Sequence, residues 1–566
     1  MKAARRTRRA VLPRHQPGPV QRTVNAVVDG LVEAFNPRVA AKRRAWREHG
    51  HSLASLSGAA SGRLFDGWHT QARDANALTL SDLPAVRQRS REAALNNPVY
   101  LAIRETMTQH VVGARGIVPQ SQIDYERLGI TQAQAEEFQG AADDVWREAQ
   151  GIADVTGRQR TWGGLLRLVY RSMFDGGDVF PSFPMKLWPG IGLRTRVNLI
   201  EAERVATPYG NASDPKVRGG VSLDSWGAPQ GFWVSRGHPG DEHPSVQNWA
   251  FEFWPRMRNG RLNVLQLYQQ DRIGQARGIP RLSSVLDLID QVEQYVDSTL
   301  LAAEIHARMS FWIKTEGDPD DWGGLSDEDR EALYGGRYEM GIEAGSVNVL
   351  AKGDEVETVG STTPSRYFDP FVVRMLRLAS SATKAPFALA FGDSGGENYS
   401  SMRRQWQSFR HVIDCEQDAL QALCEAYYFH AIYDAWLDGR LLPDAPWLRF
   451  LDSPELWTAA VWTRPALGSV DPTKETTSDI AAVDAHLRSP QDVIAANGGD
   501  WRTTLRQIAE FAAERERLGL AAPAPAAAAE SPPDDPDGDE LDEDLEDDAE
   551  DADELEEADE LQEAAR

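Results

Sequence analysis

The segment 374–411, RMLRLASSATKAPFALAFGDSGGENYSSMRRQWQSFRH, joins two predicted helices through a glycine-rich loop. Pro386 ends the first helix, which we expect over 370–384, because proline lacks the amide hydrogen that a helix interior needs. The second helix begins near position 400, and its apolar residues recur every three or four positions as far as Trp436. At 1.5 Å per residue, this helix is about 50 Å long. One soluble domain rarely needs so long a helix, so its length favours a layered assembly.

The glycine-rich loop contains GDSGG, the sequence around the nucleophile of chymotrypsin-like proteases. That chemistry needs Ser394 to meet a histidine and an aspartate beside a backbone oxyanion hole. Here the five residues lie between two predicted helices, no TAAHC-like segment precedes them, and Glu397 follows. A serine hydrolase that uses Ser394 is therefore kept only as an alternative.

The first predicted helix carries a basic stripe. Arg374, Arg377 and Lys384 fall on one face, with Ser381 between the last two. The predicted packing face lies elsewhere on the helix and consists of Phe371, Met375, Leu378 or Ala379, and Ala382. A solvated surface would also carry such a stripe. In a ring of subunits, the stripe would surround a bore and follow DNA phosphates without reading the base sequence.

The rest of the body alternates between helical and strand patterns. Periodicity predicts further helices at 81–96, 98–112, 131–149, 162–174, 281–312, 475–487, 490–496 and 501–518. Short β-branched or aromatic runs predict strands at 179–184, 197–199, 231–235, 250–253 and 262–267, and a hairpin at 345–350 and 355–359. The sequence thus predicts an α+β fold.

The charge of the 566-residue chain is unevenly placed. Its 60 Lys+Arg and 86 Asp+Glu give a net charge of −26. Residues 530–566 hold 21 acidic residues and one basic residue, a net of −20, whereas residues 1–48 hold 12 basic and three acidic residues, a net of +9. The pattern predicts a disordered basic arm, a nearly balanced body and an acidic tail that cannot pack a core.

Several protein classes are excluded. The two cysteines lie nine positions apart in a predicted helix, which fits neither a disulfide framework nor a zinc site. No apolar run approaches the 18 residues of a membrane span, and the arginine-rich start lacks the apolar core of a secretory signal. The segment 238–243, HPGDEH, concentrates potential metal ligands, but its prolines indicate a solvated loop. No phosphate-binding glycine motif occurs, so we expect neither a metal nor a cofactor.

Six segments carry a family resemblance through their order and spacing. They are RQRSREAALNNPVYLAIRETMTQHVVGARGIVPQ (87–120), DSWGAPQGFWVSRGHPGD (224–241), QARGIPRLSSVLDLIDQVEQYVDSTLLAAEIHARMSFWI (275–313), the segment 374–411, AWLDGRL (435–441) and DPTKE (471–475). Together they resemble the lambda-type portal proteins of tailed bacteriophages, the head–tail connectors through which DNA is packaged and ejected. The resemblance covers about residues 80–518.

The resemblance implies a portal fold with a mixed α/β wing, a helical stem, a small α/β clip, a long kinked helix and a helical crown. The implied division is 1–80 basic arm and loop, 81–280 wing, 281–314 first stem helix, 315–362 clip, 363–385 second stem helix, 386–399 tunnel loop, 400–437 long helix, 438–520 wing return and crown, and 521–566 Ala/Pro linker and acidic tail. The tunnel-loop residues would be Gly392, Asp393, Ser394, Gly395, Gly396, Glu397 and Asn398.

The resemblance also implies a non-enzymatic function. The chain would form a ring, of twelve subunits in this family, at one capsid vertex of the virion, after assembly in the host cytoplasm. It would conduct double-stranded DNA without sequence specificity, dock the terminase large subunit and a head–tail adaptor, contact the major capsid or scaffold protein, and possess no membrane partner. Arg374, Arg377 and Lys384 would be DNA-channel residues. A monomeric nucleic-acid-binding adaptor that uses the basic arm is a further alternative.

Overall fold

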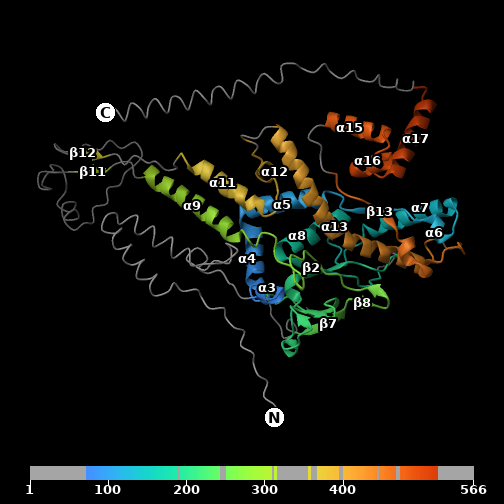
Figure 1. Ribbon diagram of the computed structural model, residues 1–566, viewed down its shortest axis with the longest axis horizontal. Coiled ribbons are helices and arrows are strands. Elements are labelled where there is room, and N and C mark those ends of the chain that lie inside the picture. The colour runs from blue at the N-terminus through green and yellow to red at the C-terminus, as the bar shows by residue number, and fades with distance from the viewer. Residues whose placement is uncertain are drawn as a thin grey trace, which may run out of the picture. The chain divides into compact units, whose positions relative to one another are not determined.

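Figure 1 shows the computed structural model, which describes residues 72–520 except 188–191, 243–249, 309–311, 315–354, 358–365, 394, 396–398, 443–444 and 467–471. The chain divides into two compact units, Met1–Asp74 and Ala75–Arg566. The description below concerns the second unit. None of the helices in its described part combines the length and the apolarity that a membrane crossing requires.

A group of helices forms the first half of this unit. They are α3 (Ala75–Thr79), α4 (Leu83–Asn96), α5 (Pro98–Val112), α6 (Tyr125–Leu128), α7 (Gln132–Ala149) and α8 (Trp162–Gly176). Local chemistry sets their ends. The Asn97 side chain accepts the Tyr100 amide hydrogen and caps α5, whose first residue is proline. Thr131 and Gln134 cap the start of α7 reciprocally. The helices expected at 98–112, 131–149 and 162–174 are thus confirmed to within two residues.

Short antiparallel strands follow these helices. They are β2 (Asp178–Ser182), β3 (Asn198–Glu201), β4 (Val217–Arg218), β5 (Val221–Leu223), β6 (Pro229–Ser235), β7 (Phe251–Pro255), β8 (Met257–Arg258), β9 (Arg261–Leu262) and β10 (Leu267–Tyr268), with 3₁₀ turns at Ala202–Arg204 and Tyr209–Asn211. One sheet has the order β10-β2-β3 and another the order β4-β5-β6-β7. A small apolar cluster that includes Phe180 and Phe232 joins the two sheets. The strand expected at 262–267 was wrong in extent, because only its ends pair within β9 and β10.

The 39-residue helix α13 (Tyr399–Leu437) runs through the main hydrophobic core. Its buried side chains recur along one face and include Phe409, Ile413, Leu420, Cys424 and Tyr427. The Tyr427 hydroxyl donates to the Ala149 carbonyl at the end of α7, and its ring stacks on Trp162 of α8. The long helix expected over 400–437 is therefore confirmed, and it ties α5, α7 and α8 together.

Two helices of different lengths pair beside this core. They are α9 (Leu286–Arg308) and α11 (Phe368–Ser381), and Figure 1 shows them side by side. Tyr295 of α9 packs its ring against Phe368 and Phe371 of α11. Beyond them, β11 (Trp312–Lys314) pairs with β12 (Glu355–Glu357). The predicted hairpin strand 345–350 lies outside the described residues.

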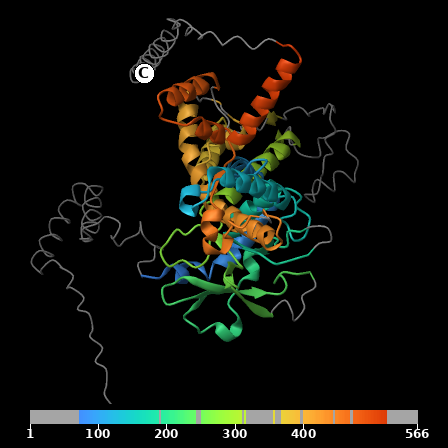
Figure 2. The same ribbon diagram turned by 90° about the vertical axis from the view of Figure 1, so that its right-hand side faces the viewer.

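The C-terminal part returns to the first helices and then leaves them. It contains a 3₁₀ turn (Phe450–Asp452), α14 (Pro454–Trp457), β13 (Ala460–Thr463), α15 (Pro472–Asp484), α16 (Pro490–Ala496) and α17 (Trp501–Arg517). Strand β13 pairs with β1 (Val118–Ser121), which lies far away in sequence. In Figure 2, α15–α17 lie at the top and the β4–β7 sheet lies at the bottom. The resemblance implied a return of the chain to the 81–280 region within 438–520, but the sequence did not predict this strand pairing.

A buried ion cluster holds three distant segments together. Asp178, at the start of β2, accepts hydrogen bonds from Arg87 of α4 at 2.9 Å and from Arg277 at 2.5 and 3.0 Å. The Gly278 amide donates to the same carboxylate at 3.2 Å. Arg277 also donates to the carbonyls of Val205 and Ala202. The RGIP motif, Arg277–Pro280, therefore has a structural role in the packing of α4 and β2.

Candidate functional site

Arg374 and Arg377 both lie exposed on α11, as expected for residues of a solvent-facing stripe. The Arg377 guanidinium also lies over the ring of Phe387, 5.1 Å from its centre. Such cation–π contact limits the freedom of the side chain without removing its charge. Two of the three predicted channel residues therefore share one helical face.

Lys384 lies beyond the end of that helix. Helix α11 ends at Ser381, three residues before the predicted end, and Lys384 adopts a left-handed backbone with φ of 57°. The cause is local, because Pro386 follows and the segment must turn before α12 (Phe387–Phe391) begins. Lys384 is exposed but lies beyond the helix that carries the stripe, so its place beside Arg374 and Arg377 stays a prediction.

The predicted packing face of α11 is confirmed at Ala379, which is buried, and at Phe371, whose ring packs against Tyr295 although it is partly exposed. Phe371 and Leu378 are exposed and share the arc of Arg374 and Arg377, whereas Ala379 and Ser380 are the buried residues of the helix. The exposed arc of α11 thus combines two cations with two large apolar side chains. Such a surface suits contact with another protein surface better than it suits bulk water.

The glycine-rich loop is described at only part of its length. Gly392 ends α12 in the left-handed region with φ of 69°, and the Asp393 carboxylate accepts the Gly395 amide hydrogen at 2.9 Å. In this Asx turn, the Asp393 carboxylate is hydrogen-bonded to the local backbone two residues on. Ser394 and residues 396–398 lie outside the described residues, so the arrangement of the tunnel-loop candidates Gly396, Glu397 and Asn398 stays a prediction.

The sequence reasoning missed a basic surface at the start of α13. Arg403, Arg404 and Arg410 are exposed, and no acidic residue occurs in the sequence from 399 to 413. The signal was present in the quoted segment as a run of uncompensated charge on the first turns of the long helix. These arginines follow the glycine-rich loop in sequence, as Arg374 and Arg377 precede it.

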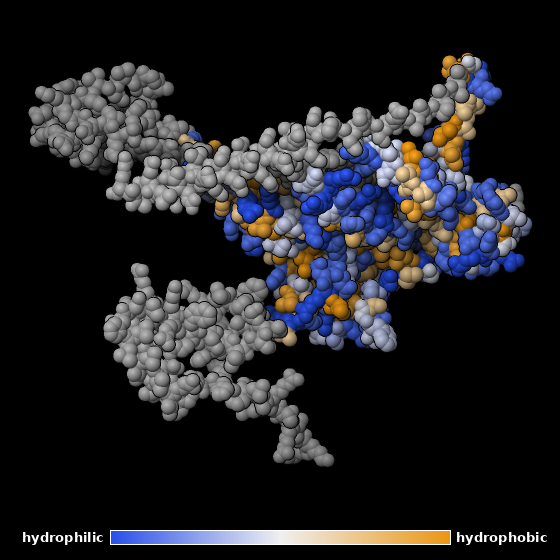
Figure 3. All heavy atoms as spheres, turned by 45° about the horizontal axis from the view of Figure 1, so that its top comes forward, coloured by the Kyte–Doolittle hydropathy of each residue, from blue (hydrophilic) through white to orange (hydrophobic). Residues whose placement is uncertain are grey.

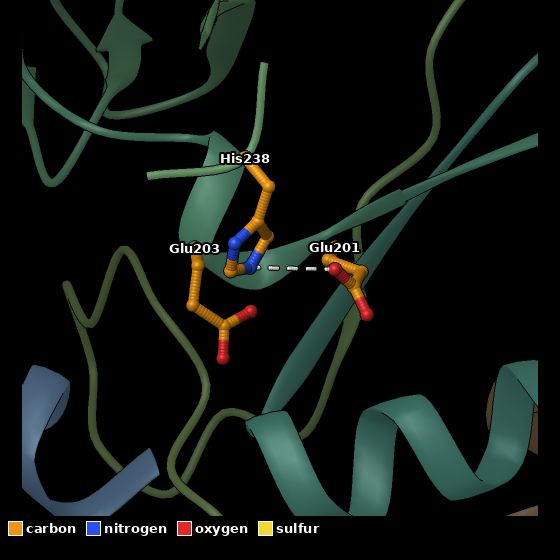
Figure 4. Close-up of side chains that lie close together, drawn as sticks. All are labelled: Glu201, Glu203 and His238. Atoms are coloured by element: carbon orange, nitrogen blue, oxygen red, sulfur yellow. Dashed lines mark ion pairs between the residues drawn. The ribbon is translucent and has the colours of Figure 1, made fainter. Parts of the chain in front are cut away.

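The histidine-containing loop meets two carboxylates, Glu201 at the end of β3 and Glu203 in the 3₁₀ turn that follows, and Figure 4 shows His238 between them. His238 Nδ1 accepts the Gly240 amide hydrogen at 3.0 Å, which places the ring proton on Nε2, 3.5 Å from the Glu201 carboxylate. Arg91 donates to both oxygens of Glu203, at 2.6 and 2.8 Å. Burial raises the pKa of Glu203, but the Arg91 hydrogen bonds outweigh it and lower that pKa.

This cluster fits an ion pair better than a metal site. Arg91 already supplies the positive charge that a metal ion would bring, and the Nε2 lone pair of His238 is taken by its proton. Among the described residues it is the group of three potential ligands that the fold assembles. The loop residue His243 lies outside the described residues.

Comparison with known proteins places these features in a wider group. The family model for the phage portal protein, lambda family, matches residues 61–417. The chain is 26% identical over 487 residues to a probable portal protein of Halomonas phage phiHAP-1, covering 81% of this chain and 86% of that one. It is 22% identical over 508 residues to portal protein B of Escherichia phage lambda, covering 83% and 91%. A solved chain from the virion of a native gene transfer agent particle matches with 15% identity and a TM-score of 0.41, covering 78% and 94%.

Proposed function

The chain belongs to the lambda family of phage portal proteins, and from this we propose that it forms the DNA channel at one vertex of a tailed-phage capsid. The observation that carries the proposal is the match over 61–417, which includes the helical body, the α9–α11 pair, the glycine-rich loop and the basic start of α13. The channel would serve both genome packaging and ejection. The chain would have no catalysis of its own, so ATP hydrolysis would belong to a separate terminase.

We assign the parts of the channel by their order in the chain. Helices α9 and α11 would form the stem, residues 315–362 the clip, 386–399 the tunnel loop and α13 the long helix behind it. The clip would dock the terminase large subunit during packaging and a head–tail adaptor afterwards. The wing at 81–280 and the crown formed by α15–α17 would face the major capsid or scaffold protein. Mass photometry with negative-stain imaging of the full-length chain tests whether it forms such a ring.

The exposed apolar side chains support a ring of identical subunits. Large apolar residues are exposed on α9, α11 and α17, at Val296, Leu300, Leu301, Phe371, Leu378, Leu505, Ile508 and Phe511. In a closed ring, each subunit buries one such surface against a different surface of its neighbour. Figure 3 shows apolar atoms along the projecting α17 at the upper right of the view.

Substitution of the apolar face of α17 tests the ring contact. Leu505, Ile508 and Phe511 lie one helical turn apart and are 53%, 58% and 66% exposed. Replacing all three by serine should raise the concentration needed for ring assembly by roughly tenfold or more. The reason is that burying one large apolar side chain contributes about 1.5–3 kcal/mol. Mass photometry across a dilution series measures the shift. The matched control replaces Glu510, Glu514 and Arg517, which are exposed on the opposite face, by serine. Equal behaviour of the two variants would show that α17 is not a subunit contact.

Neutralising the proposed channel residues should weaken the interaction with DNA. With Arg374, Arg377 and Lys384 all replaced by glutamine, we expect rings to form and DNA retention in filled heads to fall on the order of tenfold, because phosphate contacts contribute most of the sequence-independent affinity. The control replaces the exposed residues Arg127, Lys216 and Arg258, which lie on other elements. Quantification of DNA per head by nuclease protection gives the result. Retention equal to that of the control would remove these residues from the channel.

A further inference from the structure

A large cleft separates the start of α17 from the helical body. It has a volume of about 1770 Å³, and its walls are the turn at 113–116, strand β1, helix α7, the start of α8, the segment 463–466 and the first turns of α17. The contacts that join α17 to the body across it are polar. Arg502 donates to the Ser121 carbonyl at 2.8 Å and to the Gln139 side chain, and Gln120 donates to Asp500. The cleft is open to solvent, and both polar and apolar side chains line it.

The cleft has an excess of positive charge. Arg115, Arg160 and Arg506 line it and are exposed, and in the described part of the chain no carboxylate forms an ion pair with them. The N-terminal ends of α7, α8 and α17 also line it. A helix N-terminus carries a partial positive charge that adds to that of neighbouring arginines.

The acidic groups of the cleft are engaged by other partners. Asp144 pairs with Arg147 at 2.5 Å. Asp500 caps α17 by accepting the amide hydrogens of Arg502 and Thr503. Asp143 accepts the Ser121 amide hydrogen, and its burial raises its pKa to about 6. Asp143, Asp500 and Glu136 form no ion pair in the described part of the chain. The cleft is lined by four carboxylates and six arginines, an excess of two positive charges; the arginines are Arg115, Arg147, Arg160, Arg464, Arg502 and Arg506.

The occupant that best fits this cleft is a flexible polyanion of the same chain. The sequence after α17 consists of the Ala/Pro linker 521–529 and the acidic segment 530–566, whose net charge is −20. The 17-residue α17 is about 26 Å long at 1.5 Å per residue. Nine linker residues reach about 30 Å when extended. The linker is thus long enough to bring position 530 back from the end of α17 to its beginning, where the cleft opens.

We propose that the acidic segment 530–566 docks in this arginine-lined cleft of its own subunit, where it is held by charge complementarity with Arg115, Arg160 and Arg506. The docking gives the tail a binding site beyond the portal role, and it does not depend on ring formation or on DNA conduction. Duplex DNA presents the same kind of charge, so a docked tail also excludes phosphate backbones from the cleft.

Photo-crosslinking in the full-length chain tests the docking. A benzophenone amino acid at Gln122, which is exposed and lines the cleft, should cross-link to residues 530–566, whereas the same group at Gln230, exposed outside the cleft, should not. The cross-link should fall about fivefold or more at 1 M salt, where the Debye length is about 3 Å. Mixing isotopically heavy and light chains shows whether the tail and the cleft belong to one subunit.

Two arginine variants separate charge from folding. Replacing Arg115, Arg160 and Arg506 by glutamine should abolish the cross-link, and replacing them by lysine should retain it, because the docking needs charge and no bidentate geometry. A thermal melt of each variant checks that the body is folded. The proposal is overturned if the tail cross-links no better from Gln122 than from Gln230, or if the glutamine variant retains the cross-link. It is also overturned if cross-links form only between heavy and light chains, or if the cleft captures added duplex DNA and not the tail.

Discussion

Replacing Asp178 by asparagine is expected to lower the free energy of unfolding by about 3–5 kcal/mol, the cost of removing one partner from a buried ion cluster. Asp178 is fully buried, and two guanidinium groups, from Arg87 and Arg277, converge on it. Burial, followed by repulsion from Arg277, already lowers the pKa of Arg87 to about 10. Without the carboxylate, two buried cations would face each other. Only backbone carbonyl oxygens and the neutral side-chain amide of the new asparagine would remain to compensate their charge. Urea denaturation followed by circular dichroism measures the loss.

The control for this prediction is Asp144→Asn. Asp144 forms an ion pair with Arg147 on the surface of α7, where both side chains are mostly exposed. Such pairs contribute about 0–1 kcal/mol. An Asp178→Asn variant that is as stable as Asp144→Asn would contradict the role assigned to the RGIP motif.

Replacing Gly278 by alanine is expected to destabilise the body by more than about 3 kcal/mol, because the added methyl group overpacks a backbone contact that cannot relax. A Cβ atom on Gly278 would lie 1.9 Å from the Gly177 carbonyl oxygen and 2.9 Å from the Cβ of Tyr268. Gly177 itself has φ of 85° and faces the Gly278 carbonyl. The two glycines therefore let the end of α8 touch the segment before α9.

Gly140→Ala provides the matched control. Gly140 lies inside α7, and a Cβ atom there would meet nothing within 4 Å. Because alanine costs less backbone entropy in a helix, this variant should gain about 0.5–1 kcal/mol. Thermal melts of both variants should thus shift in opposite directions. A Gly278→Ala variant that melts with the wild type would show that the close contact can open at no cost.

Local signals predicted the helices but not the long-range pairings. Asn97 and Pro98 mark a helix start that the structure reproduces at the same residue. The pairing of β1 with β13 joins residues more than 300 positions apart, and neither four-residue strand carries a pattern that identifies its partner. The single strand expected at 262–267 is divided between β9 and β10 in the structure. Apolar alternation does not show where pairing with one strand stops and pairing with another begins.

The candidate site was predictable only where exposure followed from helical periodicity. Arg374 and Arg377 lie on the predicted face, whereas Lys384 lies beyond a helix end that the sequence placed three residues too late. The sequence left Leu378 and Ala379 as alternatives for the packing face, and the structure buries Ala379 and leaves Leu378 exposed within one chain. Its partner, on our proposal, is a neighbouring subunit, which one sequence read as a monomer cannot reveal. The domain boundaries proposed for the clip and the tunnel loop stay predictions.

The most direct test of the channel proposal is mass photometry of the full-length chain combined with negative-stain imaging. One chain has a mass of 62.7 kDa. Twelve copies closed by rotation would give about 750 kDa, and the images should show rings with a central hole. A uniform monomer of 62.7 kDa that binds duplex DNA with a steep salt dependence would contradict the ring and favour a monomeric nucleic-acid-binding adaptor.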